Sequence, residues 1–364
     1  MRAPLSLFLA LPLLACSGAD DPAGNAAEPA AHRSPAASLP TGDSHTVPQP
    51  TALRTFGDWT AGCDNGGTCQ ANALLGEDDP APPVLVAIER AAGPDGAITL
   101  RLQREGTTAL PLTLAVDGEA VARGGKAAGE FVALTGEPAA TLARRIAAGK
   151  RLGVADGTGE AIGSISLTGA AAALRWIDAQ QGRADTVGAI VARGKRPDTR
   201  PAPALPVVQA PVIRGEAALL DPQLVTTMRA TAGCGGEQLP EVTTRPLGGG
   251  RTLALVPCVL GAYNLVSAVF VVERGKATPA QFDAPSGIAP GDVEMAAGVA
   301  DVVNGDFADG VLTSDAKGRG LGDCGVAQRF AWDGARFRLI EQREMTECRG
   351  SIDYIRTWAA RVVR

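Results

Sequence analysis

Glycine and proline recur so often in this 364-residue chain that few long helices fit between them. There are 45 glycines and 26 prolines, about one residue in five. Both interrupt regular structure, glycine through its backbone freedom and proline through its missing N–H. The chain is 45% apolar and 20% charged, which is enough to bury a core, and its length suggests about two domains. We therefore expect many short strands joined by turns.

The first fifteen residues have the pattern of a lipoprotein signal peptide. Arg2 supplies a positive charge, residues 5 to 15 are apolar, and Leu13-Leu14-Ala15 leads directly into Cys16. The apolar stretch is too short to span a bilayer. We expect cleavage before Cys16 and acylation of its thiol, with palmitate as a typical chain. Ser17 rather than Asp follows, which favours the outer membrane. The alternative is an ordinary signal peptide in which Cys16 is incidental.

Composition divides the chain into five segments. We expect a lipoprotein signal peptide at 1–15, a disordered Ala/Pro-rich tether at 16–52, an N-terminal α+β domain at 53–193, a Pro-rich linker at 194–211 and a C-terminal β-rich domain at 212–364. Both histidines, His32 and His45, lie in the tether.

In the N-terminal domain we expect two helices. Residues 137 to 148 place Leu142 and Ile146 four apart, and residues 168 to 181 begin with a threonine that can cap a helix. Short apolar or alternating runs between turn residues predict strands at 84–89, 98–104, 110–116 and 162–167.

In the C-terminal domain we expect one helix, at residues 221 to 230, with proline in its first turn. The rest of this domain is expected to be β. Its clearest strands are 251–256, 265–272, 326–332 and 336–342, the last two joined by the typical hairpin pair Asp333-Gly334. The predicted fold class is α+β and β-rich, with two disulfide-stapled domains after the lipidated tether.

Seven cysteines occur, and acylation of Cys16 leaves six. An even number in an exported chain indicates disulfides. Pairing within each domain joins the first two and leaves three connectivities for the other four, among which we favour the pairs 24 residues apart. The expected bonds are Cys63–Cys69, Cys234–Cys258 and Cys324–Cys348. No Cys-x-x-Cys occurs, so neither thiol exchange nor a zinc knuckle is indicated.

Several short segments near these cysteines carry a resemblance. They are FGDWTAGCDNGGTC at 56–69, IDAQQGR at 177–183, GRGLGDCG at 318–325, WDG at 332–334 and CRG at 348–350. In these segments and their order the chain resembles the bacterial exported family of domain of unknown function 1176, itself similar to invasion-associated locus B proteins. The resemblance covers nearly all of residues 53 to 364. It implies a periplasmic protein with a β-rich fold and carries over no catalytic residues.

Most hydrolase mechanisms are excluded because both domains lack histidine. Ser-His-Asp and Cys-His systems, a His-ligated zinc and a His general base all need it. The run Ser314 to Lys317 matches Ser-x-x-Lys of penicillin-recognising enzymes, but glycines follow at once and the partner motifs are missing, so a turn is favoured. Residues 320 to 325 match G-x-G-x-x-G, but a strand is expected after them, so no dinucleotide or other cofactor is indicated.

Two further groups of residues favour structural roles. One is an oxygen-rich cluster that lacks the spacing of a calcium-binding EF-hand loop, so solvated turns are favoured and no metal is expected. Its members are Asp301, Asn304, Asp306 and Asp309. The other group is the four tryptophans, for which core positions are favoured over ligand platforms. They are Trp59, Trp176, Trp332 and Trp358.

Two functions from different classes agree with the sequence. The favoured one is a non-catalytic, lipid-anchored periplasmic protein that binds an envelope protein, a glycan or a small molecule, with inhibition of host lysozyme as a special case. The alternative is a carboxylate-dependent hydrolase of envelope glycans, which needs two carboxylates a few ångströms apart. The net charge of −5 lacks the basic field that nucleic acids require, so nucleic acid is not an expected partner. The membrane is contacted through the N-terminal lipid.

One surface stands out as a candidate binding site. A Cys324–Cys348 bond brings the glycine-rich loop from Arg319 to Gly325 beside Arg349. Two guanidinium groups, Asp323 and exposed glycine N–H groups would then converge, which suits an anionic ligand. The structural alternative is an ion pair between Asp323 and Arg319 or Arg349.

Overall fold

The computed structural model describes residues 47–76, 84–104, 108–235, 239–287 and 295–364. The described residues belong to one compact unit. Cys16, His32, His45 and the tether up to residue 46 lie outside the described residues. At the end of the predicted tether, the N–H of Thr51 donates to the carbonyl of Thr357 at 3.1 Å. No helix in the described part is long and apolar enough to cross a membrane.

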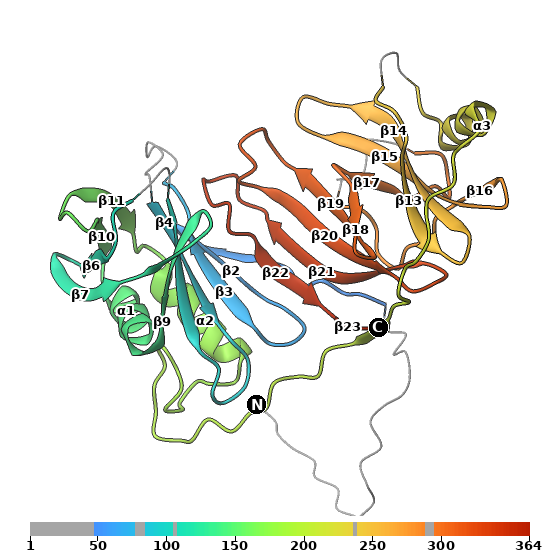
Figure 1. The fold of residues 1–364 in the computed structure, drawn as a ribbon. Helices are drawn as coiled ribbons and strands as arrows, with labels where there is room; N and C mark the ends of the chain where they lie inside the picture. The colour runs from blue at the N-terminus through green and yellow to red at the C-terminus, as the bar shows by residue number, and fades with distance from the viewer. Residues whose placement is uncertain (1–46, 77–83, 105–107, 236–238, 288–294) are drawn as a thin grey trace, which may run out of the picture. The chain divides into compact units, whose positions relative to one another are not determined.

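The N-terminal segment contains two antiparallel sheets (Figure 1). The larger has the order β1-β2-β3-β4-β5-β9-β8, and the smaller has the order β11-β10-β6-β7. Their bounds are β1 Arg54–Phe56, β2 Trp59–Cys63, β3 Cys69–Ala73, β4 Val84–Arg90, β5 Ile98–Arg104, β6 Leu112–Val116, β7 Glu119–Gly124, β8 Lys126–Ala128, β9 Phe131–Thr135, β10 Arg151–Ala155 and β11 Ala161–Ser166.

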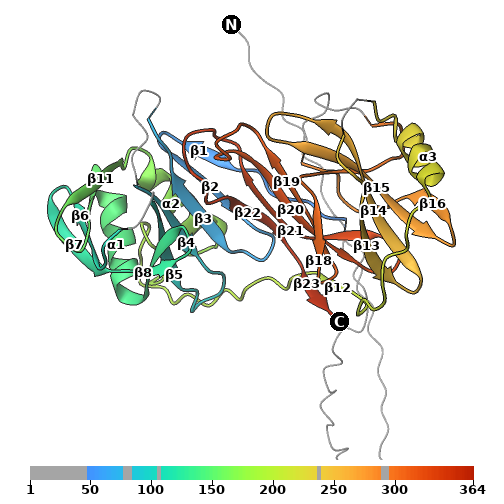
Figure 2. The same cartoon turned by 45° about the horizontal axis from the view of Figure 1, so that its top comes forward.

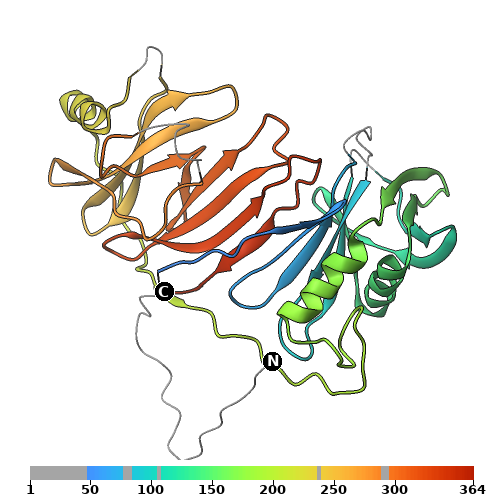
Figure 3. The same ribbon diagram turned by 180° about the vertical axis from the view of Figure 1, so that it is seen from behind.

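Two helices, α1 (Gly136–Ala148) and α2 (Ala170–Gln180), pack against the larger sheet (Figure 3). In α1, Ala139, Leu142 and Ile146 are fully buried, as the four-residue spacing predicted. The start of α2 differs from the prediction, because its N-cap is Gly169 rather than Thr168. Gly169 has φ +96°, and a Cβ there would lie 1.6 Å from the carbonyl oxygen of Phe56. Tertiary packing therefore decides this helix end.

In its described part, the C-terminal segment contains one helix and two five-stranded sheets. In α3 (Pro222–Ala232) the Asp221 side chain caps the N–H of Gln223 and Gly233 ends the helix in the left-handed conformation, two residues later than expected. The sheets have the orders β13-β14-β15-β16, with β17 on β15, and β18-β19-β20-β21-β22. Their bounds are β13 Thr243–Gly248, β14 Arg251–Leu260, β15 Leu265–Glu273, β16 Lys276–Pro279, β17 Asp301–Val303, β18 Asp306–Ala308, β19 Val311–Lys317, β20 Gly325–Trp332, β21 Phe337–Met345 and β22 Ile355–Ala359.

The predicted linker contains a strand. Val207–Gln209 forms β12, which pairs in parallel with β23 (Arg361–Val363) near the C-terminus (Figure 2). Earlier in the linker, Asp198 forms a buried ion pair with Arg183. In the same motif, the Asp178 carboxylate accepts from the N–H groups of residues 190 to 192. The segment IDAQQGR thus fixes the chain at the start of the linker. The division into domains at 53–193 and 212–364 stays a prediction.

The fold is β-rich with three helices in its described part, which confirms the predicted class. Disulfides join Cys63 to Cys69, Cys234 to Cys258 and Cys324 to Cys348, the favoured pairs. Trp59, Trp332 and Trp358 are buried, and Trp176 packs against the N-terminal core. Strand β22 contacts β2 and β3, so strands near the two ends of the chain meet (Figure 1).

Candidate functional site

The structure brings Arg319 and Asp323 together. The Arg319 Nε donates to Asp323 Oδ1 at 2.7 Å, and the Gly350 N–H donates to Asp323 Oδ2 at 2.7 Å. The Asp323 side chain is 3% exposed and that of Arg319 is 43% exposed. The hydrogen bond from Arg319 lowers the pKa of Asp323 below its ordinary value. Asp323 is therefore an ionised carboxylate whose oxygens already have donors.

Arg349 lies with a different set of groups. Its Nε donates to the carbonyl of Leu75 at 2.6 Å, its Nη1 to that of Gly57 at 3.2 Å, and its Nη2 to Asp58 Oδ1 at 2.8 Å. The predicted convergence with Arg319 is therefore not found. We call Asp58, Arg319, Asp323, Arg349 and Gly350 the junction, because they link the family segments at 56–69, 318–325 and 348–350.

The glycine N–H groups expected to face a ligand are partly used inside the loop. The Gly318 N–H donates to the carbonyl of Cys324 at 2.8 Å, and the Gly322 N–H to that of Arg319 at 3.0 Å. The junction thus has the hydrogen-bond pattern of the structural alternative, in which each charge is satisfied from within the chain.

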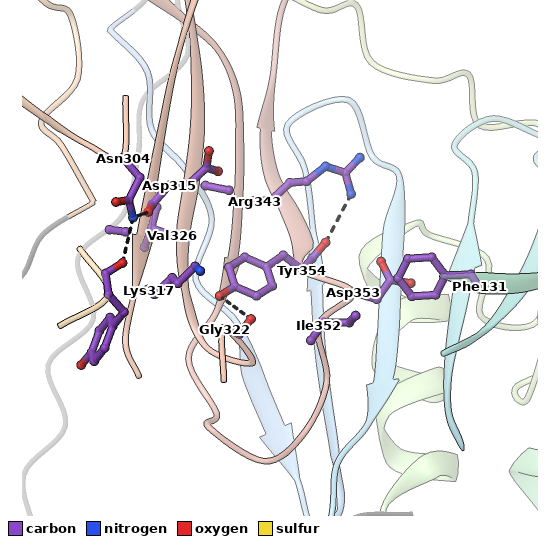
Figure 4. Close-up of a pocket in the computed structure, with 13 residues that line it drawn as sticks. Phe131, Asn304, Asp315, Lys317, Gly322, Val326, Arg343, Ile352, Asp353 and Tyr354 are labelled. Carbon is purple, nitrogen blue, oxygen red and sulfur yellow. Dashed lines mark hydrogen bonds between the residues drawn. The ribbon is translucent and has the colours of Figure 1, made fainter. Parts of the chain in front are cut away.

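Next to the junction lies a cavity of about 650 Å³. It is lined by Phe131, Tyr263, Asn304, Asp315, Ala316, Lys317, Gly322, Val326, Ala327, Arg343, Ile352, Asp353 and Tyr354. The chain has two tyrosines, and both line this cavity. We call it the tyrosine cavity (Figure 4).

Strand register places the charged residues of the tyrosine cavity. On β19, Asp315 and Lys317 are two residues apart and so share a face. Asp315 pairs with Ala327 of β20, and Ala327 pairs with Arg343 of β21. Asp315 and Arg343 therefore flank a small side chain in one row across three strands. The missing bulk at Ala327 leaves a gap between a carboxylate and a guanidinium group.

The two tyrosines hold the glycine-rich loop against the cavity. The Tyr263 hydroxyl donates to the carbonyl of Gly318 at 3.2 Å, and the Tyr354 hydroxyl donates to that of Gly322 at 3.2 Å. Burial, and then the nearby carboxylates Asp323 and Asp315, raise the pKa of Tyr354 to about 12. Tyr354 therefore stays protonated and presents its ring beside Lys317 and Gly322 (Figure 4).

The charges of the tyrosine cavity have few partners. Among the described residues, neither the Asp315 carboxylate nor the Lys317 ammonium has a hydrogen bond or ion pair. Partial desolvation raises the pKa of Asp315, although the positive charge of Lys317 acts in the opposite direction. Arg343 donates from Nε to Glu341 at 3.2 Å and from Nη1 to the Tyr354 carbonyl at 3.3 Å. Its Nη2 contacts no acceptor in the described part.

Asp353, the second acidic residue of the cavity, is committed elsewhere. Its Oδ2 accepts from Arg101 Nε at 2.7 Å and its Oδ1 from Arg101 Nη2 at 3.2 Å. Its carbonyl accepts from the side-chain amides of Gln70 and Asn72. Asp353 thus fastens the loop before β22 to strands β3 and β5, and both of its carboxylate oxygens accept from Arg101.

The other residues considered from the sequence have structural roles. Ser314 lies within β19, where its buried hydroxyl accepts from the Val303 N–H at 3.0 Å, so the Ser-x-x-Lys run is a strand rather than the expected turn. Strand β20 follows the G-x-G-x-x-G match, as expected. Asn304 donates to the carbonyls of Tyr263 and Asp315. Among the described residues no group of three or more His, Cys, Asp or Glu could hold a metal.

Comparison with known proteins places these features in a family. The model described as "Protein of unknown function (DUF1176)" matches residues 53–362. The chain belongs to this family. This confirms the resemblance carried by the short segments, three of which meet at the junction.

Two individual proteins show similarity to this chain. The uncharacterized protein YpfG of Escherichia coli (strain K12) is 28% identical over 321 residues, which are 82% of this chain and 89% of YpfG. The crystal structure of invasion associated protein B from Bartonella henselae aligns at 22% identity with a TM-score of 0.29 and covers 36% of this chain and 99% of that chain. A TM-score this low establishes no shared fold.

Sequence reasoning missed the tyrosine cavity because its residues form no motif. Asp315 and Lys317 lie inside the rejected Ser-x-x-Lys run, and Arg343 lies one residue beyond the strand expected at 336–342. One signal was present, because the chain has two tyrosines and both lie near recognised segments. Tyr263 lies two residues before the strand expected at 265–272, and Tyr354 lies four residues after the CRG segment at 348–350. Which face of β19 and β21 carries the cavity becomes visible only once the strands are paired.

Proposed function

We propose that this protein is a lipid-anchored protein of the bacterial envelope that binds a small polar molecule in the tyrosine cavity without converting it. The observation that carries the proposal is a cavity of about 650 Å³ that contains both tyrosines and unpartnered charged groups of both signs. Ligand sites typically combine such volumes with aromatic surface and a few converging polar groups. Charged groups left without partners are costly unless a ligand or water satisfies them.

Binding without catalysis agrees with the state of the acidic residues. A glycan hydrolase needs a general acid and a second free carboxylate across the scissile bond. In the tyrosine cavity the pKa of Asp315 is raised, but both oxygens of Asp353 accept from Arg101. The lining residues also include no histidine, cysteine or serine nucleophile.

Attachment to the membrane is supported by the sequence before the described residues. The apolar stretch that ends in Leu13-Leu14-Ala15-Cys16 is the substrate pattern for lipidation, and the tether to residue 52 allows the folded part to stand away from the bilayer. Two or three acyl chains suffice for stable anchoring. The proposed location is the periplasmic face of the outer membrane.

Ligand binding is tested by native mass spectrometry of the protein after incubation with the low-molecular-weight fraction of envelope extract. We expect a retained small molecule on the wild type and its loss in Ala327→Trp, which fills the gap between Asp315 and Arg343. Arg329→Trp is the matched control, because Arg329 lies two residues along the same strand, is exposed and is not a lining residue. Ala327→Leu serves if the larger variant does not fold. No retained mass, or equal retention by all variants, would falsify the binding proposal.

Anchoring is tested separately by metabolic labelling with a clickable fatty acid. The wild type should be labelled and sediment with membranes, whereas Cys16→Ser should be unlabelled and soluble in the periplasm. Unchanged membrane association of Cys16→Ser would refute the lipid anchor while leaving the cavity proposal intact.

A further inference from the structure

The tyrosine cavity holds opposite charges apart. Neighbouring strands are about 4.8 Å apart, so Asp315 and Arg343, two strands apart in one row, have Cα atoms about 10 Å apart. Lys317 lies two residues along β19 from Asp315, about 7 Å away. Among the described residues no ion pair joins these three side chains, and Arg343 pairs instead with Glu341. Ala327 is the only side chain between the first two in the row.

Anionic, cationic and neutral ligands each leave some charge of the cavity without an opposite charge. A zwitterionic ligand does not. A purely anionic ligand would suit Lys317 and Arg343 but would face the Asp315 carboxylate. A purely cationic ligand would reverse the mismatch. A neutral sugar would offer no charged group to Asp315 or Lys317, which have no hydrogen bond or ion pair among the described residues. A ligand with one cationic and one anionic group leaves no charge unmatched.

We propose that the tyrosine cavity selects a small zwitterion, whose ammonium group binds Asp315 and whose carboxylate or phosphate binds Lys317 and Arg343. This inference rests on the proposed binding function and specifies its ligand class. An ammonium group offers three donors to a carboxylate, and a guanidinium or ammonium group makes charge-assisted hydrogen bonds to an oxyanion. The uncharged middle of the ligand lies over Ala327 against the ring of Tyr354.

The surroundings of the charges favour such a ligand. Arg343 is oriented by Glu341 and by the Tyr354 carbonyl, which leaves Nη2 for an acceptor. Lys317 adjoins Gly322, with its Cε 3.8 Å from the position of a Cβ there, and the Tyr354 hydroxyl is fixed on the same glycine. The site is therefore built before the ligand arrives, which limits the entropy lost on binding. In an envelope, short peptides with free ends and ethanolamine phosphate groups both carry the required pair of charges.

The experiment compares four soluble probes by isothermal titration calorimetry on the full chain. Trialanine has both charges, N-acetyl-trialanine lacks the ammonium group, trialanine amide lacks the carboxylate, and glycerophosphoethanolamine replaces the carboxylate by phosphate. We expect trialanine or glycerophosphoethanolamine to bind. Each singly blocked peptide should bind at least about 10-fold more weakly than trialanine, because a charge-assisted hydrogen bond is lost. The stronger of trialanine and glycerophosphoethanolamine identifies the source of the anionic group.

Two variants assign the charges. Asp315→Asn should remove the preference for trialanine over N-acetyl-trialanine, and Arg343→Gln should remove the preference for trialanine over its amide, as in a double-mutant cycle. Arg329→Gln is the control, since it removes a cation from the same face of the sheet outside the cavity. Lys317→Gln replaces Arg343→Gln if the latter does not fold.

The outcomes separate this inference from the proposed function. Equal affinity for blocked and unblocked peptides, or unchanged preferences in Asp315→Asn and Arg343→Gln, would overturn the zwitterion. If none of the four probes binds while native mass spectrometry finds a molecule that Ala327→Trp loses, the binding function stands and the ligand class is wrong. If none of the four probes binds and native mass spectrometry finds no retained molecule, both the binding function and the zwitterion selectivity are wrong.

Discussion

The junction and the tyrosine cavity share the loop from residue 318 to 322, yet their charged side chains differ. Those of the junction are paired within the chain, whereas two of those in the cavity are not. At the junction, Asp323 accepts from Arg319 and Gly350, and Arg349 donates to Asp58 and two carbonyls. In the cavity, Asp315 and Lys317 have no partner among the described residues. A satisfied network stabilises one geometry, whereas unpartnered charges are kept at the expense of stability.

This difference shows which features are visible in a sequence. The family segments FGDWTAGCDNGGTC, GRGLGDCG and CRG meet at the junction and account for its contacts. Recognisable motifs here mark how the chain is held together. The cavity draws instead on single residues of three strands, which form no motif. The following four predictions test this contrast, beginning with the junction.

The largest effect is expected from removing the disulfide that closes the junction. Cys324→Ala with Cys348→Ala should lower the free energy of unfolding by about 3.5 kcal/mol, because the bond closes a long loop in the unfolded chain. The short-loop pair, Cys63→Ala with Cys69→Ala, should cost about 2 kcal/mol. Urea unfolding measures both. A smaller loss for the long loop than for the short one would mean that the junction does not depend on this bond.

The next effect concerns Asp323. Asp323→Asn should cost about 1 to 3 kcal/mol at pH 7, because the buried acceptor of Arg319 and of the Gly350 N–H loses its charge. The pKa of Asp323 is lowered in the folded chain, so its stabilisation is present above the unfolded value of about 3.9 and is lost as the pH falls through the folded pKa. Unfolding of wild type and variant from pH 7 downward should therefore converge in acid. A constant difference across this range would contradict the role of the carboxylate charge.

A smaller loss is expected for the exposed partner. Arg319→Ala should lower the free energy of unfolding by less than Asp323→Asn does, since its side chain is 43% exposed and water replaces part of its interaction. The same urea titration measures it beside Asp323→Asn. If Arg319→Ala costs as much as Asp323→Asn, the loop depends on the guanidinium group more than its exposure implies.

The smallest effect is expected for Asp315→Asn, which should raise stability at pH 7 rather than lower it. The pKa of Asp315 is raised in the folded chain, so the folded state keeps this proton where the unfolded chain has lost it. Stability contributed at this position therefore falls as the pH rises from the unfolded pKa of about 3.9 through the folded pKa. Asp315→Asn lacks this fall and should melt slightly higher than the wild type at pH 7, with no difference in acid. A lower melting temperature at pH 7 would show that Asp315 supports the fold and would weaken its assignment to ligand binding.

Several elements followed from local sequence, and their agreement has local causes. Helix α1 has its buried face because Leu142 and Ile146 are one turn apart, and α3 begins at Pro222 after a capping Asp221. The hairpin of β20 and β21 turns at Asp333-Gly334. The start of α2 was misplaced because the close approach of Phe56 to Gly169 joins residues more than a hundred positions apart.

By itself the sequence determined the class of the fold, the favoured disulfides and the family, because turn residues, cysteine count and short segments act through local chemistry. It also indicated Arg319 or Arg349 as the partner of Asp323, and the structure selects Arg319. Only the tertiary structure decided that Arg349 binds Asp58 and that Asp315, Lys317 and Arg343 face one cavity. A one-residue change in register moves every side chain of a strand to the other face of its sheet. The composition of a site shared by three strands therefore depends on pairings between distant residues, which no local pattern specifies.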